Sequence, residues 1–582
     1  MLRKLLQSVR EYKRDSILAP LSISGEVVME CIIPMLMALM IDNGIIKGDM
    51  PYIFKMGGLL LACSFLSLFF GVLASKLASQ ASNGFAHNLR EDLFSHIQSF
   101  SFSNIDKFST GGLVTRLTTD ISNVQMAYQM CLRMAIRSPF MLIFSLIGAI
   151  MIDGELSLIF AVFIPILAAG MLLIGKSAHS IFTTAFKRYD RLNGIVQENL
   201  RGIRAVKAFV REDYETDKFT RVSMDICERF TKAEKKLASI NPLMQFCMYS
   251  CMILLSWFGA KAVIACGGDA ATGLSTGELT SLFTYATQIL GSLMMLSMIF
   301  VIIVISRASM ERIYGVLCEE SNIVSPENAV TEVKDGSIRF ENVSLRYNEQ
   351  SEKPVLNQVN LDIQSGMTVG ILGGTGSSKS SLVQLIPRLY DASDGCVFVG
   401  GQDVRSYDLV ALRDAVAFVL QKNELFSGTI NENLRWGDEN ATQEEIIEAC
   451  KIAQAHDFIT SFPDGYETHI EQGGTNVSGG QKQRLCIARA LLKKPKVLIL
   501  DDSTSAVDTA TDASIRKELR ECMPGVTKLI IAQRVASVMD ADRIIVLDGG
   551  EVVGFGTHDE LLLSNDIYRE VYEGQTKGSE QA

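Results

Sequence analysis

The sequence lacks the features that mark nucleic-acid-binding proteins and cysteine-based metal sites. Its net charge is −10, and it has no stripe of basic residues, which argues against a nucleic-acid partner. Its 12 cysteines are scattered, and only Cys247 and Cys251 lie close together, at helical i,i+4 spacing inside an apolar segment. That setting is typical of lipid or core packing rather than of a metal site. The first residues also carry no cleavable-signal pattern, because they lead directly into charged residues.

Long apolar runs, in contrast, fill the N-terminal half of the chain. Six of them have about 20 residues or slightly more, enough to cross a bilayer core of roughly 30 Å as helices. They lie near residues 17–41, 57–80, 133–152, 156–176, 246–266 and 280–305. Basic residues precede the first run, whereas the presumed outer loops at 152–155 and 267–273 are short and poor in them. The sequence therefore predicts a multi-pass protein of the cell membrane, surrounded by lipid, with six spans and both termini in the cytoplasm.

A glycine-rich segment, Gly373 to Ser381, follows the strand-like run 368–372 and precedes the helix-compatible run 382–386. A phosphate-cradling loop requires this context, because backbone N–H groups and the helix dipole then point at phosphate oxygens. Lys379 can reach the β- and γ-phosphates of ATP, and the Ser380 hydroxyl can ligate Mg²⁺. The alternative is a glycine-rich turn with a chance lysine. The predicted nucleotide contacts of this loop are Gly373, Gly374, Thr375, Gly376, Ser377, Ser378, Lys379, Ser380 and Ser381.

Two downstream segments support a phosphate loop. Residues 496–501 form a buried-strand pattern that ends in Asp501, an acid placed to hold Mg²⁺ through water at the C-terminal end of a strand. Between the loop and this strand lies the segment 476–484, in which Ser478 and two glycines open a helix. The start of a helix is a second place suited to phosphate.

With these motifs in this order and spacing, the sequence resembles the ATP-binding-cassette (ABC) family. Tyr347 matches the aromatic residue that stacks on adenine, and Gln421 matches the glutamine that senses Mg²⁺ and the membrane domain. Ser380, Gln421 and Asp501 are the implied Mg²⁺ ligands. The signature motif, which meets the ATP of the partner subunit, corresponds to Val477, Ser478, Gly479, Gly480 and Gln481. The dimer-contact loop corresponds to Ser505, Ala506, Val507 and Asp508.

The resemblance covers essentially the whole chain. Segments 104–120 and 198–212 look like the two intracellular loops of ABC exporters, whose short coupling helices sit on the ATP-binding domains. It implies an all-α six-helix transmembrane domain at 1–320, a linker at 321–336 and an α/β nucleotide-binding domain at 337–582. The implied cofactors are ATP and Mg²⁺, the implied activity is that of an ATPase and translocase, and the implied partner is a second half-transporter subunit.

Two catalytic positions depart from the family pattern. Asp502 stands where a glutamate usually positions the attacking water, and its side chain is one methylene shorter. Gln533 stands where a histidine usually contacts the γ-phosphate; it can donate a hydrogen bond but cannot titrate near neutral pH. A third departure, Ser378 in place of glycine, either crowds the loop if the backbone there needs a positive φ or is tolerated with little change in affinity. We therefore expect the chain's own site to bind ATP and to hydrolyse it poorly.

Because the signature motif is intact, the chain resembles the degenerate-site subunit of bacterial heterodimeric multidrug exporters. In ABC dimers each ATP lies between the phosphate loop of one chain and the signature motif of the other, so this chain would complete a competent site on its partner. The alternatives are a homodimeric exporter with Asp502 as a slow base, a membrane-anchored ATP sensor and an ATP-gated channel. The coupling-loop patterns argue against the sensor, and no ring of repeated charges in the spans suggests a pore.

Two features of the spans concern the substrate, which we expect to be a small amphipathic molecule such as a drug or a lipid. Glu26 and Glu30 lie one turn apart on one face of the first span, where a carboxylate is costly and usually faces a cavity or a partner. They either line the transport cavity and favour cationic substrates, or lie near the cytoplasmic interface, solvated or paired with basic residues. Met294, Met295 and Met298 in the sixth span suit a surface that repacks around varied ligands, or serve ordinary helix packing.

Overall fold

The computed structural model describes residues 1–265, 273–348, 353–502 and 507–580. The chain separates into two compact units. The N-terminal unit contains Met1–Gln98 and Gly111–Glu319, and the C-terminal unit contains Ser99–Thr110 and Glu320–Ala582. The short segment Ser99–Thr110 therefore leaves the N-terminal unit between two of its long helices and folds with the C-terminal unit.

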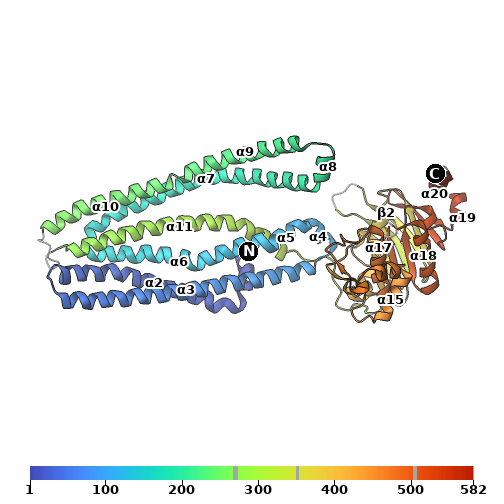
Figure 1. Cartoon of the computed structure of the whole chain (residues 1–582), viewed down its shortest axis with the longest axis horizontal. Coiled ribbons are helices and arrows are strands. Elements are labelled where there is room, and N and C mark those ends of the chain that lie inside the picture. The colour runs from blue at the N-terminus through green and yellow to red at the C-terminus, as the bar shows by residue number, and fades with distance from the viewer. Residues whose placement is uncertain (266–272, 349–352, 503–506, 581–582) are drawn as a thin grey trace. The chain divides into compact units, whose positions relative to one another are not determined.

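The N-terminal unit is helical (Figure 1). Within the described residues, six helical stretches are long and apolar enough to cross a membrane, which confirms the predicted six-span architecture. The helices that begin in this part of the chain are α1 (Leu2–Leu5), α2 (Lys13–Met40), α3 (Met50–Gln98), α5 (Thr110–Thr115), α6 (Ile121–Ile152), α7 (Gly154–Arg201), α8 (Ile203–Ala208), α9 (Glu212–Leu237), α10 (Ile240–Ala265) and α11 (Thr276–Leu317).

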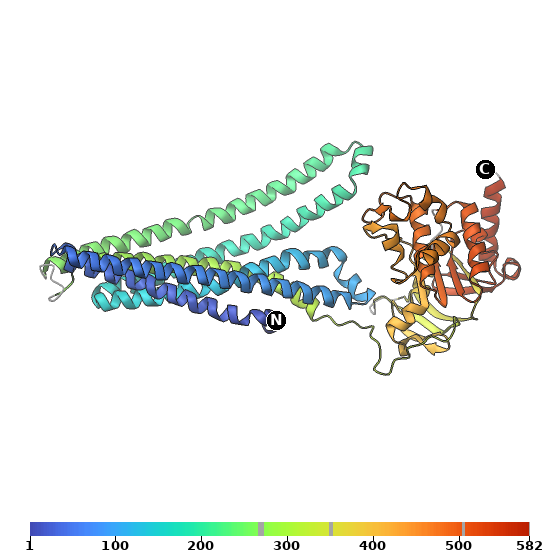
Figure 2. The ribbon, with the colours of Figure 1, turned by 60° about the horizontal axis from the view of Figure 1, so that its bottom comes forward.

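Several of these helices are much longer than a bilayer requires. Helix α3 has 49 residues, and at a rise of 1.5 Å per residue it is about 73 Å long, roughly two and a half times the thickness of the hydrocarbon core. Helices α7 and α9 pack against each other and are joined by α8, and in Figures 1 and 2 this pair diverges from α6 and α11 toward α8. The long helices therefore continue well beyond their apolar segments.

Small residues bring α2 and α3 close together. Ala74 of α3 is buried against Ile23 and Val27 of α2, and Ala78, one turn further along α3, is buried against Ala19. In a membrane no hydrophobic force drives helices together, so alanines that allow close backbone approach are typical of such contacts.

The C-terminal unit has an α/β fold. A six-stranded sheet has the order β12-β11-β3-β10-β9-β6, in which β12 is antiparallel and the other strands are parallel. A second, antiparallel sheet has the order β2-β1-β4-β5, and β7 pairs with β8. The strands are β1 (Ile338–Leu345), β2 (Leu356–Ile363), β3 (Thr368–Gly373), β4 (Asp394–Val399), β5 (Gln402–Asp403), β6 (Val416–Val419), β7 (Gly428–Thr429), β8 (His469–Ile470), β9 (Val497–Asp501), β10 (Thr527–Ile531), β11 (Arg543–Asp548) and β12 (Glu551–Gly556).

Helices surround these sheets. They are α4 (Phe102–Phe108), α12 (Lys379–Gln384), α13 (Leu409–Ala415), α14 (Ile430–Leu434), α15 (Gln443–Ile452), α16 (His456–Ser461), α17 (Gly479–Leu492), α18 (Thr509–Cys522), α19 (His558–Ser564) and α20 (Asp566–Glu580). Strands β9 and β10 are buried along their whole length, as expected for central strands of a parallel sheet. Because parallel strands end at the same edge, the segments that follow β3, β9 and β10 meet there.

Candidate nucleotide site

The loop between β3 and α12 has the backbone of a phosphate cradle. Gly376 has φ +83° and Ser378 has φ +73°, so both residues lie in the left-handed region. At Gly373 a Cβ atom would come within 2.3 Å of the carbonyl oxygen of Leu547, so only glycine fits that position. Ser378 therefore does occupy a backbone conformation that favours glycine, at a cost of roughly 1 kcal/mol.

Lys379 lies across this loop. Its ammonium group donates to the carbonyl oxygens of Gly373 and Gly374, each at 2.8 Å, and to the hydroxyl of Ser377 at 3.3 Å. Burial lowers the pKa of Lys379, and the carboxylates of Asp501 and Asp502 oppose that shift. The lysine is thus held at the mouth of the loop, close to two acids, where a phosphate oxygen would take over its hydrogen bonds.

Ser380 and Asp501 meet beside the loop. Asp501 ends β9 with 3% of its surface exposed. Burial raises its pKa, and a hydrogen bond from the Ser380 side chain opposes the shift. A serine hydroxyl and a carboxylate are hard oxygen donors of the kind that Mg²⁺ prefers. These two residues therefore fit the role of Mg²⁺ ligands.

The two residues predicted at catalytic positions, Asp502 and Gln533, also meet. The Gln533 amide Nε2 donates to Asp502 Oδ2 at 2.9 Å. Burial raises the pKa of Asp502, while hydrogen bonds from Gln421 and Gln533 lower it. The structure thus brings the predicted Gln421, Asp502 and Gln533 together around one carboxylate. Asp502 has φ +48°, a conformation in which aspartate is among the better-tolerated residues.

Tyr347 lies beside the start of α12. Its hydroxyl donates to the Ser381 hydroxyl at 2.9 Å and to Gln384 Oε1 at 3.2 Å. Its ring meets the edge of Tyr390, with 4.9 Å between ring centroids. Tyr390 donates in turn to Asp106 of α4 at 2.7 Å. We did not predict Tyr390 from the sequence, because a lone aromatic after a short helix carries no motif; only the docking of α4 reveals it.

The signature residues form a separate feature. Ser478 caps α17: its hydroxyl accepts from the Gln481 N–H at 3.3 Å, and the Gln481 side chain accepts from the Ser478 N–H at 2.9 Å. Val477 packs against the core, and Gly479 and Gly480 form the first turn of the helix. Within the described residues, no hydrogen bond joins this motif to the phosphate loop of the same chain.

The predicted dimer-contact loop is described only in part. Ser505 and Ala506 lie outside the described residues. Val507 is buried, and Asp508 caps α18 by accepting from the Thr511 N–H at 2.9 Å and from the Thr511 hydroxyl at 2.7 Å.

The carboxylates of the first span have a basic partner. Arg137 of α6 donates to Glu26 through Nη1, and its Nη2 donates to both carboxylate oxygens of Glu30, each at 2.8 Å. The sequence did not identify Arg137, because the pairing depends on how α2 packs on α6. Two carboxylates and one guanidinium leave this cluster with one net negative charge. Met294, Met295 and Met298 of α11 are exposed in the single chain.

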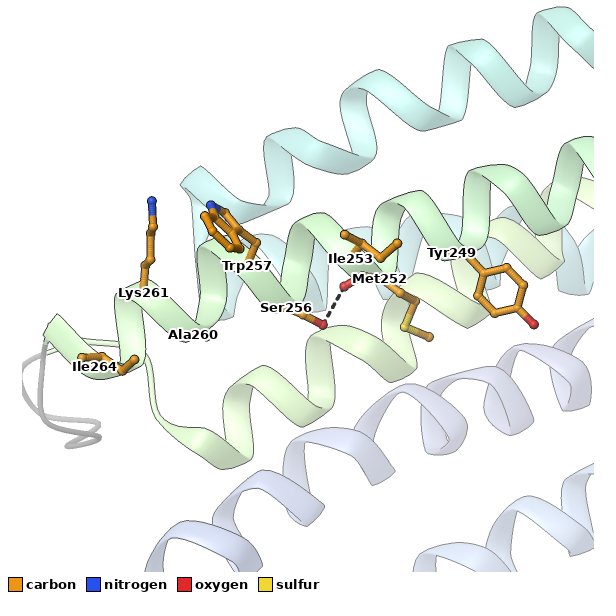
Figure 3. Close-up of a pocket in the computed structure, with 8 residues that line it drawn as sticks. All are labelled: Tyr249, Met252, Ile253, Ser256, Trp257, Ala260, Lys261 and Ile264. Atoms are coloured by element: carbon orange, nitrogen blue, oxygen red, sulfur yellow. Dashed lines mark hydrogen bonds between the residues drawn. The ribbon is translucent and has the colours of Figure 1, made fainter.

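An open depression lies elsewhere, on α10. Figure 3 shows its eight lining residues, which all come from this one helix, so it is an open helix face rather than an enclosed site. The ammonium of Lys261 lies 4.9 Å from the centre of the Trp257 ring. A tryptophan and a lysine near the end of a span are typical of the membrane interface. We assign no ligand to this face.

Comparison with known proteins agrees with this architecture. Residues 17–293 match the family model of the ABC transporter transmembrane region, and residues 356–505 match that of the ABC transporter. The chain is 36% identical over the full length of both proteins to a Bacillus subtilis protein described as the uncharacterized ABC transporter ATP-binding protein YfiB. It is 33% identical to the ATP-dependent lipid A-core flippase of Syntrophus aciditrophicus, over 84% of this chain and 80% of that one. A solved bacterial Atm1-family ABC exporter with ATP bound shares the fold, with a TM-score of 0.83 at 24% identity over 97% of this chain and 99% of the other.

Proposed function

Because the chain belongs to the ABC transporter family, as an exporter half-transporter that needs a dimer partner, we propose that it is the degenerate-site subunit of a heterodimeric exporter. Its six-span membrane domain and α/β ATPase domain make it an ATP-binding translocase. Its own nucleotide site binds ATP and hydrolyses it poorly, while its intact signature motif completes a competent site on the partner.

The hydrogen bond between Gln533 and Asp502 carries this proposal. Both residues replace the groups that the family uses to orient and activate water, and they face each other at 2.9 Å. The Asp502 carboxylate is occupied by two amides, from Gln421 and Gln533, instead of being presented to a water molecule. A base must lie within hydrogen-bond reach of the proton that it abstracts, and a misplacement of 1 Å can cost about a hundredfold in rate.

The binding part of the site is retained. The bonds of Lys379 to the loop and the contact of Ser380 with Asp501 support a role of these residues in holding the phosphates and Mg²⁺. Bound Mg²⁺ would supply positive charge that neutralises the phosphates. Tyr347 supplies an aromatic ring for adenine, and the helix dipole of α12 adds to the positive potential of the loop. The site therefore suits long retention of ATP.

For the transported substrate, we propose a small amphipathic molecule, drug or lipid, with a preference for cations. The net negative charge of the Glu26–Arg137–Glu30 cluster supports that preference, since a charge placed at membrane depth usually serves a pathway or a partner. If Glu26→Gln with Glu30→Gln leaves the transport of cationic dyes unchanged, the preference is wrong.

The test of the heterodimer is ATP hydrolysis by the purified chain, alone and assembled with an ABC half-transporter that carries the catalytic glutamate and histidine. We expect negligible turnover alone and robust turnover in the assembly. Ser478→Ala in this chain should abolish the activity of the assembly, because Ser478 serves the partner's site, whereas Asp502→Asn should change it little.

This pair of variants separates the proposal from its runner-up. In a homodimer with Asp502 as a slow base, the chain alone would turn over ATP, and Asp502→Asn would be as damaging as Ser478→Ala. That result would replace the asymmetric mechanism with the homodimeric one.

A further inference from the structure

The C-terminal helix α20 holds the loop that follows β10. The side-chain amide of Gln575 uses both of its polar atoms on this loop. Its Oε1 accepts from the Val535 N–H at 2.8 Å, and its Nε2 donates to the Gln533 carbonyl oxygen at 2.9 Å. The two backbone groups flank Arg534. They lie just after the end of β10, beyond the hydrogen bonds that pair this strand with its neighbours. One glutamine from about 40 residues further along the chain therefore satisfies them.

The loop held in this way carries the residue that meets Asp502. The Gln533 side chain donates to the Asp502 carboxylate, and its backbone carbonyl accepts from Gln575. A continuous series of hydrogen bonds therefore runs from α20 to the nucleotide site. A shift of the loop by about 1 Å would stretch these bonds beyond the normal range of 2.7–3.2 Å.

Helix α20 is anchored firmly enough to act as a support. Tyr568 is fully buried, and its hydroxyl lies 2.7 Å from His558 Nδ1. Its backbone N–H donates to the Asn565 side chain at 2.9 Å, and the Tyr572 ring packs 5.2 Å from that of His558. Gln575 lies one turn beyond this anchor, so the packing of the tyrosines fixes where its amide reaches.

We propose that Gln575 is a positioning residue of the nucleotide site, through which α20 fixes Gln533 against Asp502. The proposal rests on the proposed function only for the role of Gln533 beside bound ATP. The mechanical part, the restraint of the 533–535 backbone by α20, holds whether the exporter is heterodimeric or homodimeric.

The first test measures hydrogen–deuterium exchange in the full-length protein, comparing Gln575→Ala with Glu570→Gln, an exposed change on the same helix. Loss of the Gln575 bonds should raise exchange of the segment 533–537 by roughly five- to tenfold, as expected for one or two neutral hydrogen bonds. Exchange in β10 and in the segment 566–572 should stay as in the unaltered protein. Unchanged exchange at 533–537, or an equal rise throughout β10, would overturn the proposal.

The second test measures the release of a fluorescent ATP analogue with Mg²⁺ in a double-mutant cycle. Gln575→Ala should speed release by roughly fivefold in the unaltered chain and have no further effect in a Gln533→Ala background. Additive effects would show that Gln575 does not act through Gln533. Gln575→Glu, which keeps the acceptor for Val535 but loses the donor to Gln533, should give an intermediate rate.

These outcomes are separable from those of the proposed function. Rapid hydrolysis by the chain alone would remove the degenerate site but leave the exchange result untouched. A failed exchange result would remove the restraint by α20 and leave the heterodimer standing.

Discussion

Restoring the two usual catalytic side chains should convert the nucleotide site of this chain into an active one. The perturbation is Asp502→Glu, alone and combined with Gln533→His. Glutamate extends the carboxylate by one carbon–carbon bond, about 1.5 Å, toward the water position. Since 1 Å of misplacement can cost about a hundredfold, a gain of up to that size is available.

The structure also shows what the single change loses. The longer carboxylate would be freed from the hydrogen bond of Gln533 but would also lose the orientation that this bond gives it, at a cost of about 1 kcal/mol, a factor of about five. Asp502 also has a positive φ, which aspartate tolerates better than glutamate. We therefore expect roughly a twentyfold rise in turnover for Asp502→Glu, and roughly a hundredfold rise when Gln533→His is added.

The assay is phosphate release by the purified full-length chain alone, because its intact signature motif should complete the repaired site in a homodimer. Lys379→Ala in the doubly changed chain serves as the control and should remove the gain. If both variants bind ATP and neither hydrolyses it faster than the unaltered chain, then Asp502 and Gln533 do not limit the reaction, and the degenerate-site mechanism is wrong.

Three further predictions concern the loop, the membrane cluster and Mg²⁺. Ser378→Gly should relieve the left-handed strain at φ +73° and stabilise the chain by roughly 1 kcal/mol, measurable by thermal unfolding; Ser377→Gly, in the same loop, should give no such gain. Arg137→Met should destabilise the N-terminal unit by about 2 kcal/mol, less than for a fully buried pair because Arg137 is about one-third exposed. Adding Glu26→Gln and Glu30→Gln should restore the lost stability. An unchanged melting temperature of the Arg137→Met variant would contradict this prediction. Burial raises the pKa of Asp501 above its ordinary value of 3.8, so its carboxylate gains a proton at a higher pH than a normal aspartate does. Mg²⁺-dependent ATP affinity should therefore fall as the pH drops through that range, whereas the Asp501→Asn variant should bind ATP weakly at every pH. A titration midpoint at the ordinary value would refute the shift.

The fold class and the strand–loop–helix setting of the proposed nucleotide site could be predicted because their signals are local. A glycine-rich turn between a strand and a helix positions Lys379 by its own backbone, and the apolar strand that precedes Asp501 places that acid at a sheet edge. The spans are equally local, since each is a continuous apolar run.

The missed residues share the opposite property. Arg137, Tyr390 and Gln575 each act on a partner far away in the sequence, through helix packing or the docking of a terminal helix. A glutamine in a polar C-terminal segment looks like any solvated side chain until the fold brings it to the end of β10. The sequence also did not decide whether Ser378 has a positive φ, because the residue type alone does not fix the backbone conformation.

The excursion of Ser99–Thr110 into the C-terminal unit changes how force can pass along the chain. The two units are joined covalently at three places, before Ser99, after Thr110 and at Glu319, instead of by a single linker. A domain connected through one flexible linker can receive a pulling force but not a torque. The C-terminal unit here is connected at three points, through α3, through α5 and after α11, so a motion of one unit has three covalent routes to the other.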